Sequence, residues 1–331
     1  MQRSNRVRLG VEALEPRRLL AAGRFAVIGD YGFAGPNEAA VAELVHGWNP
    51  DLVLTVGDNN YGTGAAETID ANIGQYYQRY IGNYQGQYGP GSPVNRFFPS
   101  LGNHDWWYPS IDSIDPYLNY FDLPGAGFHS SSDNERYYDF QFGGVHFFAI
   151  DSNLREIHGT DRFSPQAQWL QRELAASTAE FQVVYFHHPP YGSGLEGSEL
   201  RMRWPFAQWG ADAVLSGHEH LYERLAIDGI PYIVNGLGGA SIYEVGPPIP
   251  ESQVIYRENF GATLVSAEGD SLTFEFHSIA SGDTLVDRFT IHAVPEPESL
   301  SLAIVATIGP AVLLARARAL RGSASADARL H

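Results

Sequence analysis

Residues 24–60 of the chain read RFAVIGDYGFAGPNEAAVAELVHGWNPDLVLTVGDNN. Residues 24–28 and 51–56 are short apolar runs that indicate buried strands, and residues 37–48 between them have the pattern of an amphipathic helix. A β-α-β opening of this kind predicts two parallel strands, each of which runs into a Gly-Asp pair. Because ligand sites in open α/β sheets collect at the carboxyl ends of such strands, we expect chemistry at these two pairs.

Three further blocks place metal-binding side chains after an apolar run in the same way. The five blocks are Gly29-Asp30-Tyr31-Gly32, Gly57-Asp58-Asn59-Asn60-Tyr61, Gly102-Asn103-His104-Asp105, Val184-Tyr185-Phe186-His187 and Gly217-His218-Glu219-His220. Their oxygen ligands come first and their imidazoles last, an order that is hard to obtain by chance. Oxygen ligands suit hard cations, whereas imidazole suits zinc, iron and similar ions. The sequence therefore predicts a hydrolase built around two metal ions.

The blocks contain enough ligands for two ions. The candidate ligands are Asp30, Asp58, Tyr61, Asn103, His187, His218 and His220. A carboxylate has two oxygens, so one Asp can bridge two ions and bring each ion to four protein contacts. His218 and His220 are two residues apart, which puts both rings on one side of an extended segment. This pair can therefore serve two neighbouring ions.

The five blocks resemble those of the calcineurin-like metallophosphoesterases and, within that family, of the purple acid phosphatases. The resemblance covers roughly residues 24–292. Generic members of the family carry Asp-x-His in the first block, whereas this chain has Gly32 in place of the histidine. Tyr61 instead follows Asp58 where the purple enzymes carry the tyrosinate that binds ferric iron. The resemblance implies an α/β fold of the α/β/β/α type, a two-sheet β-sandwich flanked by helices.

The resemblance also implies a role for each ligand. It assigns the ferric ion to Asp30, Asp58, Tyr61 and His220, and a divalent ion (Fe²⁺, Zn²⁺ or Mn²⁺) to the bridging Asp58 with Asn103, His187 and His218. His187, rather than its neighbour His188, matches the family ligand because Pro189 and Tyr191 follow at the expected offsets. The implied reaction is hydrolysis of phosphate monoesters by in-line attack of metal-bound hydroxide on phosphorus.

The proton donor is less well defined than the ligands. His104 resembles the family's histidine that contacts the phosphate and helps to protonate the leaving alkoxide. A second active-site histidine of the purple enzymes is missing, and Glu196 and Gly197 occupy its possible positions. Glu196 can act as the acid if its surroundings keep it protonated, and His188 is the alternative. Two rival functions stay open: a phosphodiesterase or nucleotidase at the same ions, and a surface protein whose metal site serves only structure or binding.

The composition excludes several classes of protein. The chain has no Cys, which rules out disulfides, zinc–thiolate sites and Cys nucleophiles. Residues 25–293 hold 33 acidic residues against 11 Arg and no Lys, a net charge of −22. Such a surface repels nucleic-acid phosphates, so we expect no nucleic-acid partner and a small phosphorylated substrate attracted by bound metal ions. The sequence leaves the oligomeric state open.

Both ends of the chain resemble export and processing segments. Residues 1–23 are basic and contain Leu14-Glu15-Pro16-Arg17-Arg18-Leu19-Leu20, which resembles an element near the start of some bacterial cell-surface proteins. A basic leader without a specific role is the alternative. Residues 294–331 combine Val294-Pro295-Glu296-Pro297, an apolar stretch over 300–315 and three trailing arginines, a pattern that resembles the PEP-CTERM sorting signal. We therefore expect an exported protein, at the cell surface or outside, whose hydrophobic tail helix attaches transiently to the membrane before processing.

Residues 24–293 between these ends show no linker or repeat and are expected to form one catalytic domain. The pattern predicts a helix near residues 67–80, a hairpin over 137–151, a helix from Ser164-Pro165 to about residue 176, strands at 181–186 and 213–215, and two alternating strands over 264–291.

Other polar and aromatic residues near the blocks receive no catalytic role. Asp105 is expected to orient a ligand, Asp151 to be structural, and His146 to be a surface or packed histidine. Three aromatic residues belong either to the core or to the rim of the substrate cleft: Trp106, Trp107 and Tyr108. Arg201 and Arg203 either meet a substrate phosphate or lie on a solvated helix face. Residues 236–239 (Gly-Leu-Gly-Gly) are expected to form a tight turn near the metals.

Overall fold

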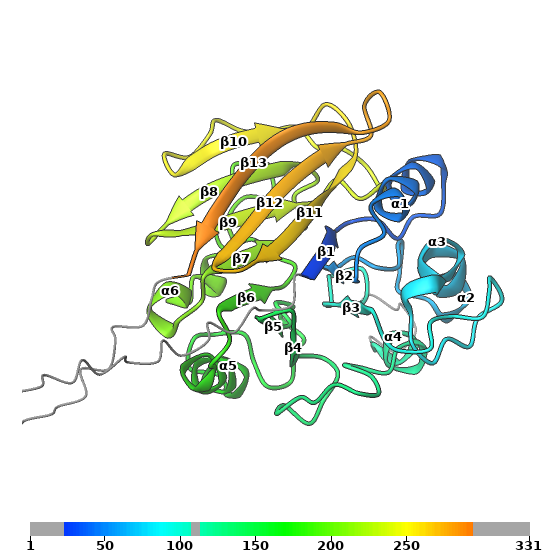
Figure 1. Cartoon of the computed structure of the whole chain (residues 1–331), viewed down its shortest axis with the longest axis horizontal. Coiled ribbons are helices and arrows are strands. Elements are labelled where there is room, and N and C mark those ends of the chain that lie inside the picture. Colours follow the sequence, from blue (N-terminus) through cyan, green and yellow to red (C-terminus); the bar gives the residue numbers. More distant parts are fainter. Residues whose placement is uncertain (1–22, 107–112, 294–331) are drawn as a thin grey trace, which may run out of the picture. The chain divides into compact units, whose positions relative to one another are not determined.

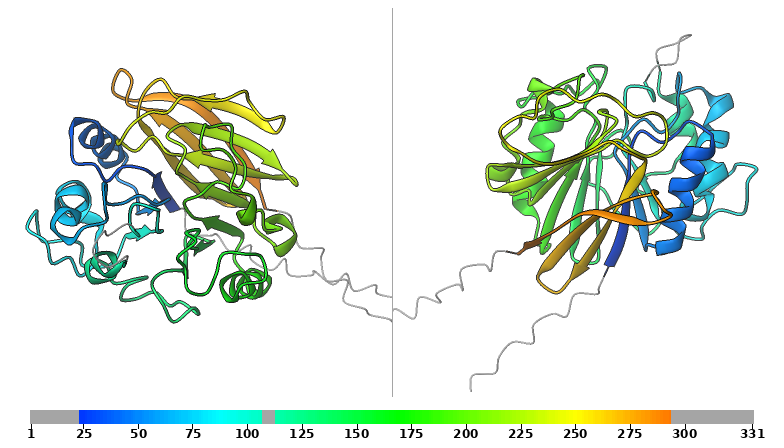
Figure 2. Two further views of the ribbon diagram at one scale, coloured as in Figure 1. Left: turned by 180° about the vertical axis from the view of Figure 1, so that it is seen from behind. Right: turned by 90° about the horizontal axis from the view of Figure 1, so that it is seen from above.

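The computed structural model describes residues 23–106 and 113–293. Within this part, two mixed β-sheets pack against each other and helices lie on their outer faces (Figures 1 and 2). Aromatic pairs join the sheets: Phe98 stacks on Phe140 with ring centroids 3.8 Å apart, and Tyr222 stacks on Phe276 at 4.1 Å. The predicted two-sheet sandwich flanked by helices is confirmed.

The first sheet combines the predicted parallel strands with an antiparallel extension. Its order is β13 (Thr284–His292), β12 (Ser271–Ser278), β11 (Gly261–Glu268), β1 (Gly23–Ile28), β2 (Leu52–Thr55) and β3 (Phe97–Pro99). β1, β2 and β3 run parallel, as expected for β1 and β2. The prediction of two strands over residues 264–291 is wrong, because the segment holds most of three. The alternation continues across the turn at Ser281 and Gly282, whose positive φ angles of 53° and 97° reverse the chain.

The second sheet has four parallel strands in its middle. Its order is β10 (Ser252–Tyr256), β8 (Tyr222–Ile227), β9 (Ile230–Asn235), β7 (Ala213–Ser216), β6 (Phe181–Tyr185), β5 (Val145–Ala149) and β4 (Tyr138–Phe142). β4 and β5 form the predicted hairpin, and β6 and β7 lie where strands were expected. The sequence analysis expected β3 only as the apolar run before the third block, and it assigned no strands to β8, β9 or β10.

The helices lie mainly on the outer faces of the sheets (Figure 1). The longer ones are α1 (Pro36–Trp48) and α5 (Pro165–Ala176), and the short ones are α2 (Ala66–Ile69), α3 (Gln75–Tyr77), α4 (Asp115–Tyr120) and α6 (Phe206–Trp209). A π-helical segment (Asp70–Gly74) and a 3₁₀ turn (Gln78–Tyr80) link α2 and α3 into the helix predicted near residues 67–80. Ser164 caps α5 as predicted, because its Oγ accepts a hydrogen bond from Ala167 N at 3.2 Å.

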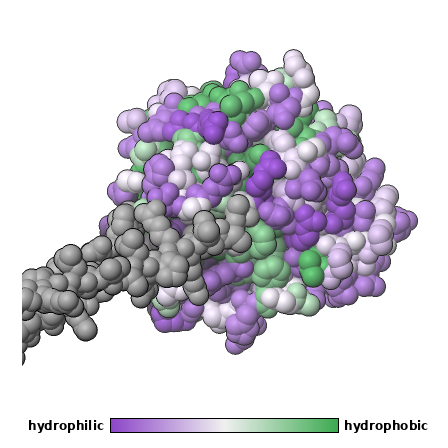
Figure 3. Space-filling model, in the orientation of Figure 1, coloured by the Kyte–Doolittle hydropathy of each residue, from purple (hydrophilic) through white to green (hydrophobic). Residues whose placement is uncertain are grey.

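The visible surface of the described residues is mainly hydrophilic, with small separate apolar patches (Figure 3). No helix among residues 23–106 and 113–293 is long and apolar enough to cross a membrane. The predicted leader and the predicted hydrophobic tail lie outside the described residues.

Candidate metal centre

The five blocks lie where parallel strands end. The first three follow β1, β2 and β3 in the first sheet, and the last two follow β6 and β7 in the second. Each candidate ligand that comes first in its block lies two to four residues beyond its strand. Loops from both sheets therefore meet at one edge of the sandwich, as the β-α-β opening predicted.

Three candidate ligands have a backbone conformation that side chains other than glycine rarely adopt. Asp30, Asp58 and His218 have φ angles of 55°, 54° and 69°. Left-handed residues of this kind are uncommon and tend to cluster at functional sites, where the surrounding structure holds them. Here the holding contacts include hydrogen bonds from Asp30 N to Gly57 O at 3.1 Å and from His218 N to Asp30 Oδ2 at 2.9 Å.

We call the first group of facing side chains site 1; it consists of Asp30, Asp58, Tyr61 and His220. The Tyr61 hydroxyl lies 3.2 Å from Asp30 Oδ1 and 3.0 Å from His220 Nε2, and the last two atoms are 3.3 Å apart. Asp58 offers an oxygen within 4.8 Å of the ligand atoms of Asp30 and His220. His220 Nδ1 lies 2.6 Å from Ser241 Oγ and 3.2 Å from the carbonyl of Ser241, and these contacts orient the ring so that Nε2 faces the site.

The second group, site 2, consists of Asp58, Asn103, His187 and His218. His187 Nε2 lies 2.9 Å from Asn103 Oδ1, 3.3 Å from Asp58 Oδ1 and 3.2 Å from His218 Nδ1. His187 Nδ1 donates its hydrogen to Val56 O at 2.9 Å, which leaves Nε2 with a lone pair. Asp58 thus belongs to both groups, and the structure brings all seven predicted ligands together.

The facing atoms of both sites fit a bound metal ion. Ligands that lie about 2.0–2.2 Å from an ion are about 2.8–3.6 Å from one another, which is the spacing found here. Two carboxylates, an amide oxygen, a phenol oxygen and three imidazoles converge in this way, and a cation between them would be bound by several of these groups at once. The donor set therefore calls for positive charge at each site.

The pKa values of these groups respond to their burial and to the charges of their neighbours. Burial opposes the protonation of His187, but the carboxylates of Asp58 and Asp30 outweigh it and raise its pKa to about 9. Burial and the neighbouring His187 lower the pKa of His218 to about 4. Burial, Asp58 and Asp30 raise the pKa of Tyr61 well above its usual value. A phenolate at Tyr61 therefore needs a strong cation beside it.

Gly32 cannot carry a larger side chain in this fold. A Cβ atom at this position would lie 1.8 Å from the carbonyl oxygen of Asn59, because the first and second blocks pack backbone against backbone. A histidine at position 32 would require the two loops to separate. The Tyr61 side chain reaches site 1 from the second block instead, which matches the pairing of Gly32 and Tyr61 noted in the sequence.

Asp105 holds the second and third blocks together. Its carboxylate accepts hydrogen bonds from Asn59 Nδ2 and Gly102 N, both at 2.8 Å. It is 2% exposed, and burial together with Asp58 raises its pKa to about 6. These contacts fit the predicted role of orienting ligands.

His104, a predicted catalytic residue, lies at the edge of site 1 and is partly exposed. Its ring lies against that of Tyr61 with centroids 4.4 Å apart, and its Nε2 is 4.0 Å from Asp58 Oδ2. Nδ1 lies 2.9 Å from the carbonyl of Gly62 and must donate there, so Nε2 is the nitrogen turned toward the site.

The other two predicted proton donors differ in their surroundings. His188 lies beside site 2, with its ring centroid 4.6 Å from that of His218 and its Nδ1 2.8 Å from Ser152 Oγ. Burial and the nearby His187 lower the pKa of His188 well below its usual value. Glu196 has an exposed side chain.

Sequence reasoning missed two residues next to site 1. Glu219 is fully buried between the two last ligands, accepts a hydrogen bond from Gly197 N at 2.5 Å, and has its pKa raised to about 7, chiefly by burial. Tyr243 stacks flat on His220 with centroids 3.9 Å apart. Glu219 was visible within the fifth block, whereas nothing near Tyr243 in the sequence links it to a ligand.

The remaining predictions near the centre have mixed outcomes. Trp106 is a buried core residue whose Nε1 donates to Asp151 Oδ2 at 2.8 Å, which fits the structural role expected of Asp151. Trp107 and Tyr108 lie outside the described residues. Arg201 is half-buried rather than solvated, and its Nη2 donates to Ser152 O at 2.8 Å.

Two further expectations about the loops can be compared with the structure. Arg203 is exposed, and its guanidinium lies 4.3 Å from the centroid of the Tyr191 ring. The glycine run lies beside the first block, where Gly238 N donates to Gly29 O at 2.9 Å, but it bends without the hydrogen bond of the expected tight turn.

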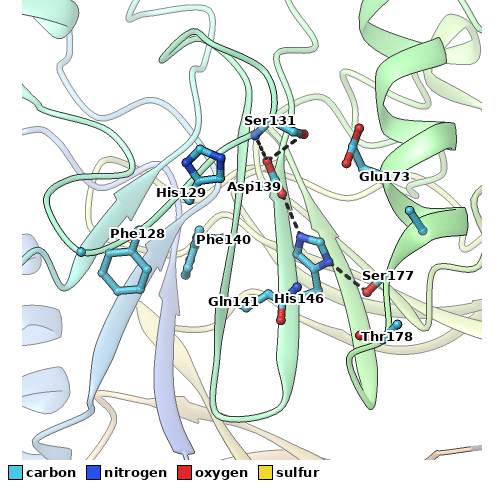
Figure 4. Close-up of a pocket in the computed structure, with 12 residues that line it drawn as sticks. Phe128, His129, Ser131, Asp139, Phe140, Gln141, His146, Glu173, Ser177 and Thr178 are labelled. Atoms are coloured by element: carbon cyan, nitrogen blue, oxygen red, sulfur yellow. Dashed lines mark hydrogen bonds and ion pairs between the residues drawn. The ribbon is translucent and has the colours of Figure 1, made fainter.

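His146 is a packed histidine in a separate cavity of about 440 Å³ (Figure 4). Its Nε2 lies 2.9 Å from Asp139 Oδ2 and its Nδ1 2.9 Å from Ser177 Oγ. The order Ser–His–Asp resembles a hydrolase triad, but Ser177 Oγ also accepts hydrogen bonds from Ala179 N and Gln182 Nε2. These bonds end α5, so the array is structural and the expectation of a packed histidine is confirmed.

Comparison with known proteins adds family information to this geometry. The sequence model of the Calcineurin-like phosphoesterase family matches residues 23–222. Purple acid phosphatase 15 of Arabidopsis thaliana is 28% identical over 249 residues, which cover 66% of this chain and 45% of that protein. The phosphoenolpyruvate phosphatase of Allium cepa is 27% identical over 214 residues, covering 60% of this chain and 41% of that protein. The chain thus spans less than half the length of these relatives.

Solved structures share the fold. A purple acid phosphatase from yellow lupin seeds superposes with a TM-score of 0.65 at 19% identity, covering 82% of this chain and 54% of that chain. A Plasmodium protein described as the anchor in the inner membrane complex gives a TM-score of 0.64 at 15% identity, covering 83% of this chain and 90% of that chain. At such identities the likeness concerns the fold alone, and the function has to be argued from the site.

Proposed function

The chain belongs to the calcineurin-like phosphoesterase family, and we propose that it hydrolyses phosphate monoesters at a centre of two metal ions. The observation that carries this proposal is the position of Asp58. Its carboxylate belongs to site 1 and to site 2 at once, so a single residue can bridge two ions. A monoester dianion is the kind of substrate that such a pair of cations attracts in an otherwise acidic protein.

The two sites favour different ions. Site 1 offers the carboxylates of Asp30 and Asp58, the phenol oxygen of Tyr61 and one imidazole, a hard and highly charged set that suits Fe³⁺. Site 2 shares Asp58 and adds only neutral ligands, a set that suits a divalent ion such as Fe²⁺, Zn²⁺ or Mn²⁺. When bound, such a pair of ions supplies Lewis acidity toward the phosphate and lowers the pKa of bound water.

His104 is the proton donor that this geometry supports best. Nδ1 is held by the carbonyl of Gly62, so the transferable proton is on Nε2, the nitrogen turned toward the centre. His188 stands on the side of site 2, where its low pKa disfavours the protonated form. Glu196 remains an alternative that requires movement of its exposed side chain toward the centre.

The proposal is tested by kinetics on phenyl phosphate and diphenyl phosphate with metal-loaded and metal-stripped protein. We expect turnover of the monoester in the loaded protein, a much smaller kcat/KM for the diester, and loss of both activities on stripping. A higher kcat/KM for the diester would instead identify a phosphodiesterase. No turnover of either ester by protein with both sites filled would favour a binding role.

We also propose that the protein is exported, from the composition of residues 1–23 and 294–331. Expression of the full chain in a bacterium that processes PEP-CTERM tails tests this. Recovery of the full chain outside the cytoplasm supports the proposal, and retention of the full chain in the cytoplasm contradicts it.

A further inference from the structure

Four large apolar side chains are exposed on segments that connect to the candidate metal centre, three on loops and one at the start of a short 3₁₀ helix. The exposed fractions are 59% for Phe33, 77% for Leu154, 67% for Leu195 and 66% for Leu200. We call these four residues the apolar rim. Single exposed apolar residues are normal on any protein, but several of them around one site indicate a surface that binds an apolar group.

Two members of the apolar rim lie on the side of site 1. Phe33 follows the first block, and its ring lies edge-on to that of Tyr61 with centroids 6.4 Å apart. Leu195 follows Gly194, which packs so closely on Glu219 that a Cβ atom there would lie 1.9 Å from Glu219 Oε2. Leu195 is therefore held next to the fifth block.

The other two members lie on the side of site 2. Leu154 is two residues from Ser152, whose Oγ lies 2.8 Å from His188 Nδ1. Leu200 precedes Arg201, whose Nη2 donates to the carbonyl of the same Ser152 at 2.8 Å. Leu154 and Leu200 are thus linked through Ser152 to His188, which lies beside site 2.

The loop that carries Leu154 is held by side-chain hydrogen bonds at both ends. Gln166 Nε2 donates to Asp151 O at 2.9 Å and to Gly159 O at 3.0 Å, and Trp204 Nε1 donates to Thr160 O at 3.2 Å. A held loop loses little conformational entropy when a ligand packs on it. Its exposed leucine is therefore prepared for an apolar contact.

The charges beside the apolar rim are mixed, and the arginine that follows Leu200 is not free to bind an additional anionic group. Arg201 is already paired with Glu199, with Nη2 3.2 Å from Oε2. Glu196 is exposed on the same loop, in a domain that carries a large negative charge. A second phosphate or a carboxylate on the leaving group would face this negative potential.

We infer that the preferred substrates are phosphate monoesters whose leaving alcohol is an uncharged apolar group that packs on the apolar rim. This inference rests on the function proposed above, because it assumes that the metal centre takes the phosphate. It adds the class of leaving group, which the ligands of the metal centre do not determine.

The test uses a series of straight-chain alkyl phosphates from ethyl to octyl. Primary alkoxides have closely similar leaving abilities, so differences in kcat/KM report contact with the protein. Full burial of a methylene is worth about fourfold, and we expect about twofold per methylene on a half-open rim. The Phe33→Ser, Leu195→Ser double variant should lower the octyl-to-ethyl ratio of kcat/KM by about fivefold or more.

Leu285→Ser is the matched control, because it also removes an exposed leucine, which is 47% exposed. Leu285 lies on β13, and β12 and β11 separate this strand from β1, which carries the first block. The octyl-to-ethyl ratio of kcat/KM should be unchanged in this variant. A substitution that disturbs the metal ions should lower kcat/KM for both esters equally, so it does not change the ratio. Two results would contradict binding of the leaving group by the apolar rim: equal kcat/KM for all esters of the series, or an octyl-to-ethyl ratio in the double variant equal to that of the wild-type protein. Either result would leave the proposed phosphatase activity standing. Absence of turnover for every ester would overturn the proposed function and the rim together.

Discussion

Site 1 and site 2 share Asp58 but differ in the charge of their other ligands. Site 1 adds a second carboxylate and a tyrosine, whereas site 2 adds an amide and two neutral imidazoles. Three of the four site 1 ligands come from loops of the first sheet, and two of the site 2 ligands come from the second sheet. Under the proposed function, this difference in ligand charge would direct a trivalent ion to site 1 and a divalent ion to site 2.

Asp58→Asn should have the largest effect, because it removes the only charge that both sites share. We expect both ions to bind weakly and kcat/KM for phenyl phosphate to fall by about 10³-fold or more. Metal analysis after dialysis, together with a thermal melt to verify folding, measures this. A variant that keeps two ions and its activity would show that Asp58 bridges nothing.

His218→Asn should separate the two sites. The variant loses an imidazole from site 2, so we expect it to retain iron at site 1, to lose the divalent ion, and to lose about 10²-fold or more in activity. His129→Asn is the matched control, because His129 lines the separate cavity around His146 and should leave both ions bound. Equal loss of both ions from His218→Asn would argue against separate sites.

His104→Asn should affect chemistry while both ions stay bound. A general acid contributes about 10²–10⁴-fold, and it matters most for leaving groups that need a proton. We therefore expect kcat/KM to fall by about 10²-fold for ethyl phosphate and far less for 4-nitrophenyl phosphate. An equal fall for both esters would assign His104 to phosphate binding, and Glu196→Gln would then be the next variant to measure.

Glu38→Gln should have the smallest effect and tests stability apart from ligand chemistry. Glu38 is fully buried in α1, and burial raises its pKa well above its usual value. The folded state therefore keeps a proton on Glu38 that the unfolded state releases above about pH 4.5. The free energy of unfolding of the metal-free protein should fall by up to about 1.4 kcal/mol per pH unit as pH rises from there. The fall ends once the pH passes the pKa of Glu38 in the folded state. The variant lacks this slope. Urea unfolding at several pH values measures it, and equal slopes in both proteins would contradict the assignment.

Much of this centre is predictable from sequence because its ligands are local. Each predicted ligand lies within a short block after an apolar run, and the strand that precedes it determines where it points. The supports of the ligands are not local. Ser241 and Tyr243 reach His220 from a loop that follows another strand, and no spacing rule connects them. Glu219 lies within the fifth block, but the sequence does not show that its carboxyl group is buried.

The same distinction applies to the fold. β1, α1 and β2 follow from their patterns because each element is apolar on the face that it buries. β13 was missed because it is an edge strand with a largely exposed, alternating pattern that continues from β12 across a tight turn. Edge strands owe their position to pairing with a neighbour, and the single sequence does not contain that information.

The visible absorption spectrum of the iron-loaded protein, recorded beside that of Tyr61→Phe, tests the difference between the two sites most directly. The account predicts a tyrosinate-to-iron charge-transfer band in the wild-type protein and its disappearance in Tyr61→Phe, with iron still bound through Asp30, Asp58 and His220. A wild-type protein that is active with both sites filled but shows no such band, or a band that persists in Tyr61→Phe, would contradict a ferric ion at site 1.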